Sequence, residues 1–113
     1  MQRRFRIRFK DKVVIITGGG GKIGKAYALA FAREGAKVSL PDIVSADHVV
    51  KAIQDLSGTA MSDQCDVSDE ASVKAMVEQT AKRFGGIDIL VNNAAYFMNV
   101  KKGPFWEMEV GGV

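Results

Sequence analysis

The apolar positions of this chain change their period several times, and each change predicts a new element of secondary structure. Residues 13–17 form an unbroken run rich in β-branched side chains, which is typical of a strand buried on both faces. Residues 37–40 form a second short strand. Between the two strands, apolar residues recur at helical spacing until Gly35, and the expected buried stripe consists of Ile23, Tyr27, Ala30 and Phe31.

The alternation continues with a second helix and a third strand. Ser45 is the expected N-cap of this helix, which ends at Gly58. Its apolar face is formed by Val49, Ala52, Ile53 and Leu56. Residues 59–65 are extended but weakly apolar, and we therefore expect them to form a strand at the edge of a sheet.

A third helix and a fourth strand complete the pattern. Ser68 is the expected cap of the helix, and Asp69 and Glu70 occupy the first turn, where the helix dipole favours acids. The buried stripe of this helix is Val73, Met76, Val77, Thr80 and Phe84, and Gly85 with Gly86 end it. Residues 87–91 are apolar except for Asp88 and form the fourth strand.

The resulting βαβαβαβ order predicts an α/β fold with a parallel sheet of about four strands, right-handed crossovers and helices on both faces. We divide the chain into a basic N-terminal arm (1–10), the βαβαβαβ unit (11–95), and a loop with the start of a helix (96–113). The helix start is expected at residues 105–110. The fold corresponds to half of a doubly wound sheet.

Charge and composition narrow the class of partner. The 113 residues carry a formal net charge of +3, but residues 1–10 hold five of the 16 basic residues and no acid, so the rest has 11 bases against 13 acids, a net of −2. This distribution argues against a nucleic-acid surface. The arm alternates arginines with apolar residues at a period of two, which favours a solvated arm over an amphipathic targeting helix. No apolar run is long enough to span a membrane, and the single cysteine, Cys65, suits a reducing, cytoplasmic compartment.

Four consecutive glycines lie between the first strand and the first helix. Gly19-x-Gly21-x-x-Gly24 in this position satisfies the dinucleotide-binding pattern of a Rossmann-type fold, in which glycines let a pyrophosphate approach the backbone and the helix start. A purely structural glycine turn is the alternative. A P-loop is excluded, because Ile16 and Ile23 occupy positions where it needs glycine and a hydroxyl residue.

Asp42 ends the second strand, 18 residues beyond Gly24. An acidic side chain there can accept hydrogen bonds from the adenosine ribose and repels a 2′-phosphate, so we expect NAD in preference to NADP. Lys22 and Lys25 lie nearby in the sequence, and their positive charges would weaken the exclusion of NADP. The alternative is that Asp42 caps a turn beside Pro41.

These features resemble the short-chain dehydrogenase/reductase family through four ordered motifs. They are TGGGGKIG (17–24), the acidic Asp42, CDV (65–67) and NNAA (92–95). The resemblance implies that the glycine loop wraps the pyrophosphate, that Asp42 and Ile43 hold the adenosine ribose, and that Asp66 and Val67 flank the adenine. It implies further that Asn93 and Ala94 line the path to the nicotinamide ribose, while Asn92 braces the sheet. The pyrophosphate-binding residues would be Gly18, Gly20, Gly21, Lys22 and Ile23.

Two departures from that family stand out. Lys22 occupies a place where compact members have glycine, and it either crowds the loop or contacts a phosphate. Family members use a serine and a tyrosine followed four residues later by lysine, but Phe31 follows Tyr27 and Val100 follows Tyr96 at that spacing. His48 is expected to be solvated and Cys65 to be a small buried side chain, and no metal-ligand spacing is present. We therefore assign no catalytic or metal-binding residue in this chain.

Three hypotheses follow from the resemblance and from the lack of a tyrosine followed four residues later by lysine in this sequence. In the first, the chain is a truncated portion of an NAD-dependent enzyme that reversibly oxidises a secondary alcohol to a ketone, and it is inactive alone. In the second, it is a non-catalytic dinucleotide-binding or interaction module. In the third, a separate chain supplies the catalytic residues. In each case, we expect the apolar fourth strand to leave a sheet edge through which the protein self-associates.

Overall fold

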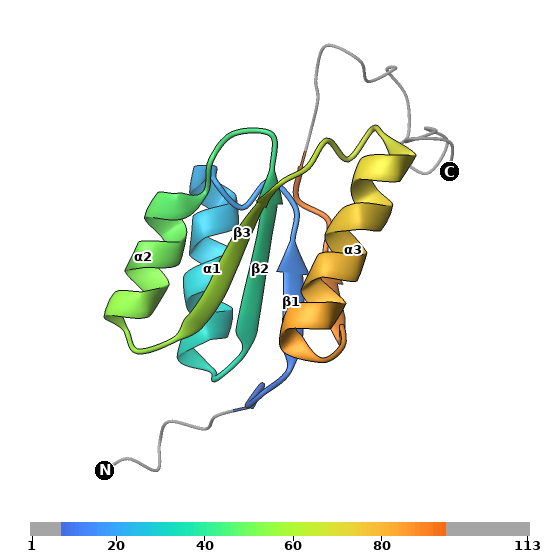
Figure 1. Cartoon of the computed structure of the whole chain (residues 1–113). Coiled ribbons are helices and arrows are strands. Elements are labelled where there is room, and N and C mark those ends of the chain that lie inside the picture. The colour runs from blue at the N-terminus through green and yellow to red at the C-terminus, as the bar shows by residue number, and fades with distance from the viewer. Residues whose placement is uncertain (1–7, 95–113) are drawn as a thin grey trace, which may run out of the picture.

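The computed structural model describes residues 8–94, which form one parallel sheet with helices on both faces (Figure 1). Four strands lie in the order β3-β2-β1-β4, so the chain starts in the interior of the sheet, runs outward to β3 and returns to the other side of β1. This confirms the predicted α/β architecture. The elements in chain order are β1 (Val13–Ile16), α1 (Lys22–Arg33), β2 (Lys37–Asp42), α2 (Asp47–Asp55), β3 (Thr59–Gln64), α3 (Glu70–Phe84) and β4 (Ile89–Val91).

The sheet separates two apolar clusters of unequal size. Val14 and Ile16 of β1 belong to the larger cluster, which α1 and α2 cover, whereas Ile15 joins the smaller cluster beneath α3. Side chains alternate between the faces of a strand, so a strand buried on both sides must be apolar throughout. All four residues of β1 are buried, as the unbroken apolar run predicts.

The outer strands differ from the central ones. β3 lies at an edge of the sheet, as its weak apolar character predicts. β4 is two residues shorter than the expected 87–91. Directly before it, the N–H of Asp88 donates to the carbonyl of Val13 at 2.9 Å, and the Asp88 carboxylate accepts from the N–H of Val13 at 2.8 Å. The side chain of Leu90 in β4 is 61% exposed.

The helix starts differ from the predicted caps by one residue. Ala46, not Ser45, is the N-cap of α2, although the hydroxyl of Ser45 still accepts a hydrogen bond from the backbone N–H of Asp47. Asp69, not Ser68, caps α3, and its carboxylate accepts a hydrogen bond from the N–H of Ala71. Ser68 and Asp69 are both suitable caps for α3, and the local backbone path decided between them, whereas α2 has an alanine without a capping side chain at that position.

The predicted buried stripe of α1 is partly wrong: Phe31 packs against the larger apolar cluster, but Ile23, Tyr27 and Ala30 are exposed. Ile23 and Tyr27 are 64% and 45% exposed, and the residues buried against the sheet are Gly24 and Ala28. α1 lies so close to the end of β1 that a Cβ on Gly24 would overlap the carbonyl oxygen of Gly18. Small residues therefore occupy the closest approach to the sheet, Leu29 and Phe31 pack at its side against the larger cluster, and Ile23 and Tyr27 point away. On the other helices, Leu56 and Val77 are likewise more exposed than expected, at 48% and 38%.

The N-terminal end of the described chain is attached to the end of α1. The backbone N–H of Phe9 donates to the carbonyl of Glu34 at 3.0 Å, and the rings of Phe9 and Phe31 pack edge to face. The rest of the basic arm and the helix expected at 105–110 lie outside the described residues. Between residues 8 and 94, no helix has the length and apolar character needed to cross a membrane.

Candidate functional site

The glycine loop connects the carboxyl end of β1 to α1. Gly18 has a φ of +70°, a conformation that side chains with a Cβ rarely adopt, and its N–H donates to the carbonyl of Pro41 at 3.0 Å. A Cβ on Gly18 would come within 3.0 Å of the Cα of Ala94. The loop therefore requires glycine at this position, both for its conformation and for its contact with the segment after β4.

The first turn of α1 is open to an anion. Gly21 is its N-cap, no side chain caps this end, and no acidic residue lies in the first turn. The backbone N–H groups at a helix start have no partner within the helix, and the helix dipole favours negative charge there. The start of α3 differs in this respect, because the side chain of Asp69 caps it.

Asp42 at the end of β2 faces the glycine loop. One carboxylate oxygen, Oδ2, accepts a hydrogen bond from the backbone N–H of Gly20 at 2.8 Å. The other, Oδ1, accepts from the N–H of Val44 at 3.3 Å. Asp42 therefore caps the turn that follows Pro41, which was the alternative prediction for this residue. It also contacts the glycine loop, which was predicted to bind a dinucleotide.

Thr17 joins the end of β1 to the segment after β4. Its hydroxyl oxygen accepts hydrogen bonds from the N–H groups of Asn93 at 2.9 Å and Ala94 at 3.1 Å. The side-chain amide of Asn93 in turn donates to the carbonyl of Gly18 at 3.3 Å. This role of Thr17 was not predicted, although its position directly before the glycines marks the end of the strand.

These elements surround an open hollow of about 290 Å³ at the carboxyl ends of β1, β2 and β4. Ligands of open α/β sheets bind at this edge. Seven of the predicted site residues line the hollow, together with Val44: Gly18, Gly20, Gly21, Asp42, Ile43, Asn93 and Ala94. Lys22 and Ile23 are exposed at the start of α1 and do not line it.

Asp66 and Val67 follow β3 and also lie outside the hollow. The carboxylate of Asp66 accepts hydrogen bonds from the hydroxyl of Ser68 at 2.6 Å and from its N–H at 2.9 Å, and these bonds lower the pKa of Asp66. Val67 packs against the apolar cluster beneath α3. Asp66 and Val67 nevertheless begin next to Asp42, because the N–H of the preceding residue, Cys65, donates to the carbonyl of Asp42 at 2.9 Å.

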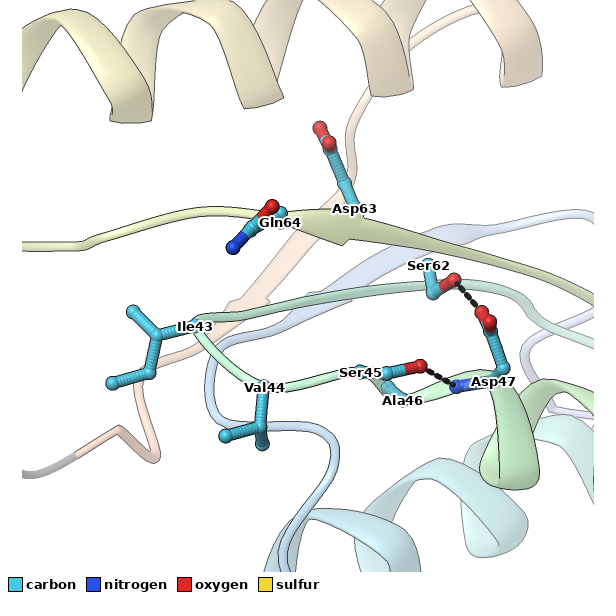
Figure 2. A pocket seen from close by; sticks show the side chains of 8 residues that line it. All are labelled: Ile43, Val44, Ser45, Ala46, Asp47, Ser62, Asp63 and Gln64. Carbon is cyan, nitrogen blue, oxygen red and sulfur yellow. Dashed lines mark hydrogen bonds between the residues drawn. The ribbon is translucent and has the colours of Figure 1, made fainter.

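A second hollow of about 380 Å³ lies on the other side of Ile43 and Val44, between the start of α2 and the end of β3 (Figure 2). The hydroxyl of Ser62 in β3 donates to the carboxylate of Asp47 at 2.6 Å, which is the main cause of a lowered pKa of Asp47. Figure 2 shows this bond together with the one from the Asp47 N–H to Ser45. The contact between Ser62 and Asp47 was not predicted, since nothing in a strand and a helix start 15 residues apart indicates that they meet.

Comparison with known proteins identifies the family. The family model described as short chain dehydrogenase matches residues 12–111. This chain belongs to the short-chain dehydrogenase family. The match includes the glycine loop, Asp42 and the segment 92–94, so all three walls of the first hollow lie inside it.

Relatives with names and solved structures agree with this family. The chain is 43% identical over 108 residues to the peroxisomal multifunctional enzyme A of Dictyostelium discoideum, covering 86% of this chain and 24% of that protein. It is 43% identical over 90 residues to the 7alpha-hydroxysteroid dehydrogenase of Escherichia coli K12, covering 78% and 35%. A solved 7 alpha-hydroxysteroid dehydrogenase complexed with NADH and 7-oxo glycochenodeoxycholic acid superposes with a TM-score of 0.78 at 41% identity, covering 85% and 38%. The chain thus spans between about a quarter and two fifths of these three proteins.

Proposed function

We propose that this chain is the NAD-binding portion of a short-chain dehydrogenase/reductase whose parent reaction is the reversible oxidation of a secondary alcohol to a ketone. The observation that carries this proposal is the contact between Asp42 and the glycine loop at one hollow. A ribose acceptor and an open, uncapped helix start lie side by side there, as a nucleotide with a pyrophosphate requires.

The residues of the hollow fit the parts of a dinucleotide. The loop 18–23 would hold the pyrophosphate, and Gly21 leaves room for it, because a Cβ there would meet only the carbonyl oxygen of Gly18, at 3.7 Å. Asp42 and Ile43 would hold the adenosine ribose, and a carboxylate at this position repels the 2′-phosphate of NADP. Asn93 and Ala94 would lie toward the nicotinamide ribose. Asp66 and Val67, outside the hollow, would flank the adenine.

The proton-transfer step is proposed to depend on residues outside these 113. A tyrosine whose pKa is lowered by a nearby lysine can exchange a proton near neutral pH, and neither Tyr27 nor Tyr96 has a lysine four residues later. When bound, NAD would accept the hydride from the alcohol. The chain alone, incubated with NAD and secondary alcohols, should form no NADH above the buffer background, and steady NADH formation that survives repurification would contradict this.

A second candidate function is a non-catalytic dinucleotide-binding or interaction module. The same hollow supports it. NAD binding without turnover is expected under both proposals. The two proposals can be distinguished by adding the remaining residues of a relative as a second chain. Only a portion of a dehydrogenase would then gain alcohol-oxidising activity.

The binding proposal is tested by calorimetry with NAD and NADP. We expect tighter binding of NAD, and Asp42→Ala should narrow the difference, because a hydrogen bond to a charged group contributes about 1.5–3 kcal/mol. Glu78→Ala is the matched control, since it removes one negative charge from the exposed surface of α3. Equal affinities for the two cofactors, unchanged by Asp42→Ala, would reject the assignment of Asp42.

A further inference from the structure

We propose that Asp42 has a second role, in which its carboxylate positions the glycine loop through the backbone of Gly20 before any cofactor binds. The role in cofactor selection rests on the proposed function, whereas the role in the loop does not. One side chain would then set both the preference for NAD and the shape of the surface that holds the pyrophosphate.

The loop is joined to β2 by two hydrogen bonds of different kinds. The bond from the N–H of Gly18 to the carbonyl of Pro41, at 3.0 Å, involves only backbone atoms and does not depend on any side chain. The bond from the N–H of Gly20 to Oδ2 of Asp42, at 2.8 Å, depends entirely on the carboxylate. Residue 42 therefore decides whether the second half of the loop stays attached to the sheet.

The position of the carboxylate is itself well determined. Asp42 is the last residue of β2, it pairs with Gln64 of β3, and its carbonyl accepts a hydrogen bond from the N–H of Cys65 at 2.9 Å. The bond from Val44 to Oδ1 restrains the other carboxylate oxygen. A charged acceptor held from both sides gives the Gly20 N–H a fixed partner, and hydrogen bonds of this kind are the stronger ones.

The rest of the loop offers few substitutes for this bond. Among the described residues, the loop's one internal backbone hydrogen bond runs from the N–H of Gly21 to the carbonyl of Gly18, at 3.2 Å. Glycines have the greatest backbone freedom in the absence of restraints. Without an acceptor at residue 42, the middle of the loop would sample other conformations, and a ligand would have to order it on binding.

This arrangement has a consequence for the choice between NAD and NADP. Removing the negative charge at residue 42 should reduce the repulsion of a 2′-phosphate, but a side chain without an acceptor should also loosen the loop and weaken the binding of both cofactors. Asparagine separates the two effects. Its carbonyl oxygen can accept the Gly20 hydrogen bond without a negative charge. Its NH2 group cannot accept the longer hydrogen bond from the N–H of Val44, so that bond is lost.

The first test needs no cofactor and measures amide hydrogen exchange in the 113-residue chain. Asp42→Ala should raise the exchange rate of Gly20 by about tenfold or more, Asp42→Asn should raise it far less, and Gly18 should stay close to the wild type in both variants. The Gly18 amide also reports whether the β2 end remains folded. An unchanged rate at Gly20 in Asp42→Ala would overturn the proposal, and so would equal rises at Gly20 in both variants.

The second test compares NAD with its analogue containing 2′,3′-dideoxyadenosine, measured by calorimetry on the wild type, Asp42→Ala and Asp42→Asn. If Asp42 acted only on the ribose hydroxyls, Asp42→Ala would bind the dideoxy analogue as tightly as the wild type does. We expect a residual loss of at least about threefold in Asp42→Ala, recovered in Asp42→Asn. No residual loss would contradict the positioning role. Failure of the wild type to bind NAD would reject the proposed function and leave the exchange result valid.

Discussion

The hydroxyl groups of Ser39 in β2 and Thr80 in α3 lie 2.8 Å apart and form a hydrogen bond in the interior of the protein. Both residues are fully buried. Among the described helices, α3 covers the face of the sheet opposite α1 and α2. The hydrogen bond is a specific polar contact between this helix and a central strand. A hydrogen bond between two buried hydroxyls can therefore fix the position of α3 along the sheet.

Removing both of these hydroxyls should destabilise the protein by less than the two single removals added together. Thr80→Val preserves the shape of the side chain but leaves the hydroxyl of Ser39 without a partner, so we expect a loss of about 1–3 kcal/mol in the free energy of unfolding. Ser39→Ala should behave similarly. The double variant should lose less than the sum of the two single losses in urea denaturation. Strict additivity would show that the pair is not coupled.

Two glycines of the same motif should respond differently to alanine. Gly24→Ala places a Cβ on the carbonyl oxygen of Gly18, so either the start of α1 must move or the protein is destabilised by several kcal/mol. Gly21→Ala adds a Cβ at an exposed position with space around it, and we expect a melting temperature close to that of the wild type. Its affinity for NAD should nevertheless fall at least about tenfold, because the pyrophosphate would approach that Cβ. Full affinity in a folded Gly21→Ala protein would contradict the placement of the pyrophosphate.

The ion pair between Arg8 and Glu34 should make stability depend on pH in the acidic range. The guanidinium and backbone N–H of Arg8 donate to the Glu34 carboxylate and lower the pKa of Glu34 below its ordinary value of 4.5. A pKa lowered by folding adds stability above about pH 4.5, and this stability is lost as the pH falls through the lowered value. Glu34→Gln should reduce the difference in melting temperature between pH 7 and pH 3, by a modest amount because the Arg8 side chain is 65% exposed. Glu78→Gln, at the surface of α3, is the control and should leave that difference unchanged.

The strand β4 should promote self-association. In the described part of the chain it pairs with β1 alone, and Leu90 exposes an apolar side chain beside the unpaired edge. Exposed strand edges with apolar side chains are templates for pairing with another chain. We expect concentration-dependent dimers or larger species in analytical ultracentrifugation, reduced by Leu90→Lys and unaffected by Gln79→Lys on α3. A wild-type chain that stays monomeric at about 100 µM with a sharp cooperative melt would contradict this expectation.

Much of the architecture could be predicted from the sequence, because its signals are local. The unbroken apolar run of β1 reports burial on both faces, and the glycines after it mark a turn that only residues without a Cβ can form. The weak apolar character of β3 indicated an edge strand. Each of these depends on neighbouring residues in the chain, which is where hydrophobic periodicity carries its information.

The helix faces show where local signals were insufficient. Ile23 and Tyr27 have the spacing of a buried stripe, but at its closest approach to the sheet α1 buries the small residues Gly24 and Ala28 instead. Periodicity identifies a repeating face, whereas the distance between two packed elements decides which side chains fit there. The same limit applies to β4, which begins two residues later than the apolar run at 87–91 predicts.

The sequence by itself determined the family, the order of the elements and the residue types available to the site. Only the tertiary structure decided which of those residues meet. Gly20 and Asp42 are 22 residues apart, and Thr17 and Asn93 are 76 apart, yet both pairs are joined by hydrogen bonds of 2.8 and 2.9 Å. Parallel pairing places the carboxyl ends of β1, β2 and β4 along one edge, so the register of the sheet, and not proximity in the chain, creates the hollow.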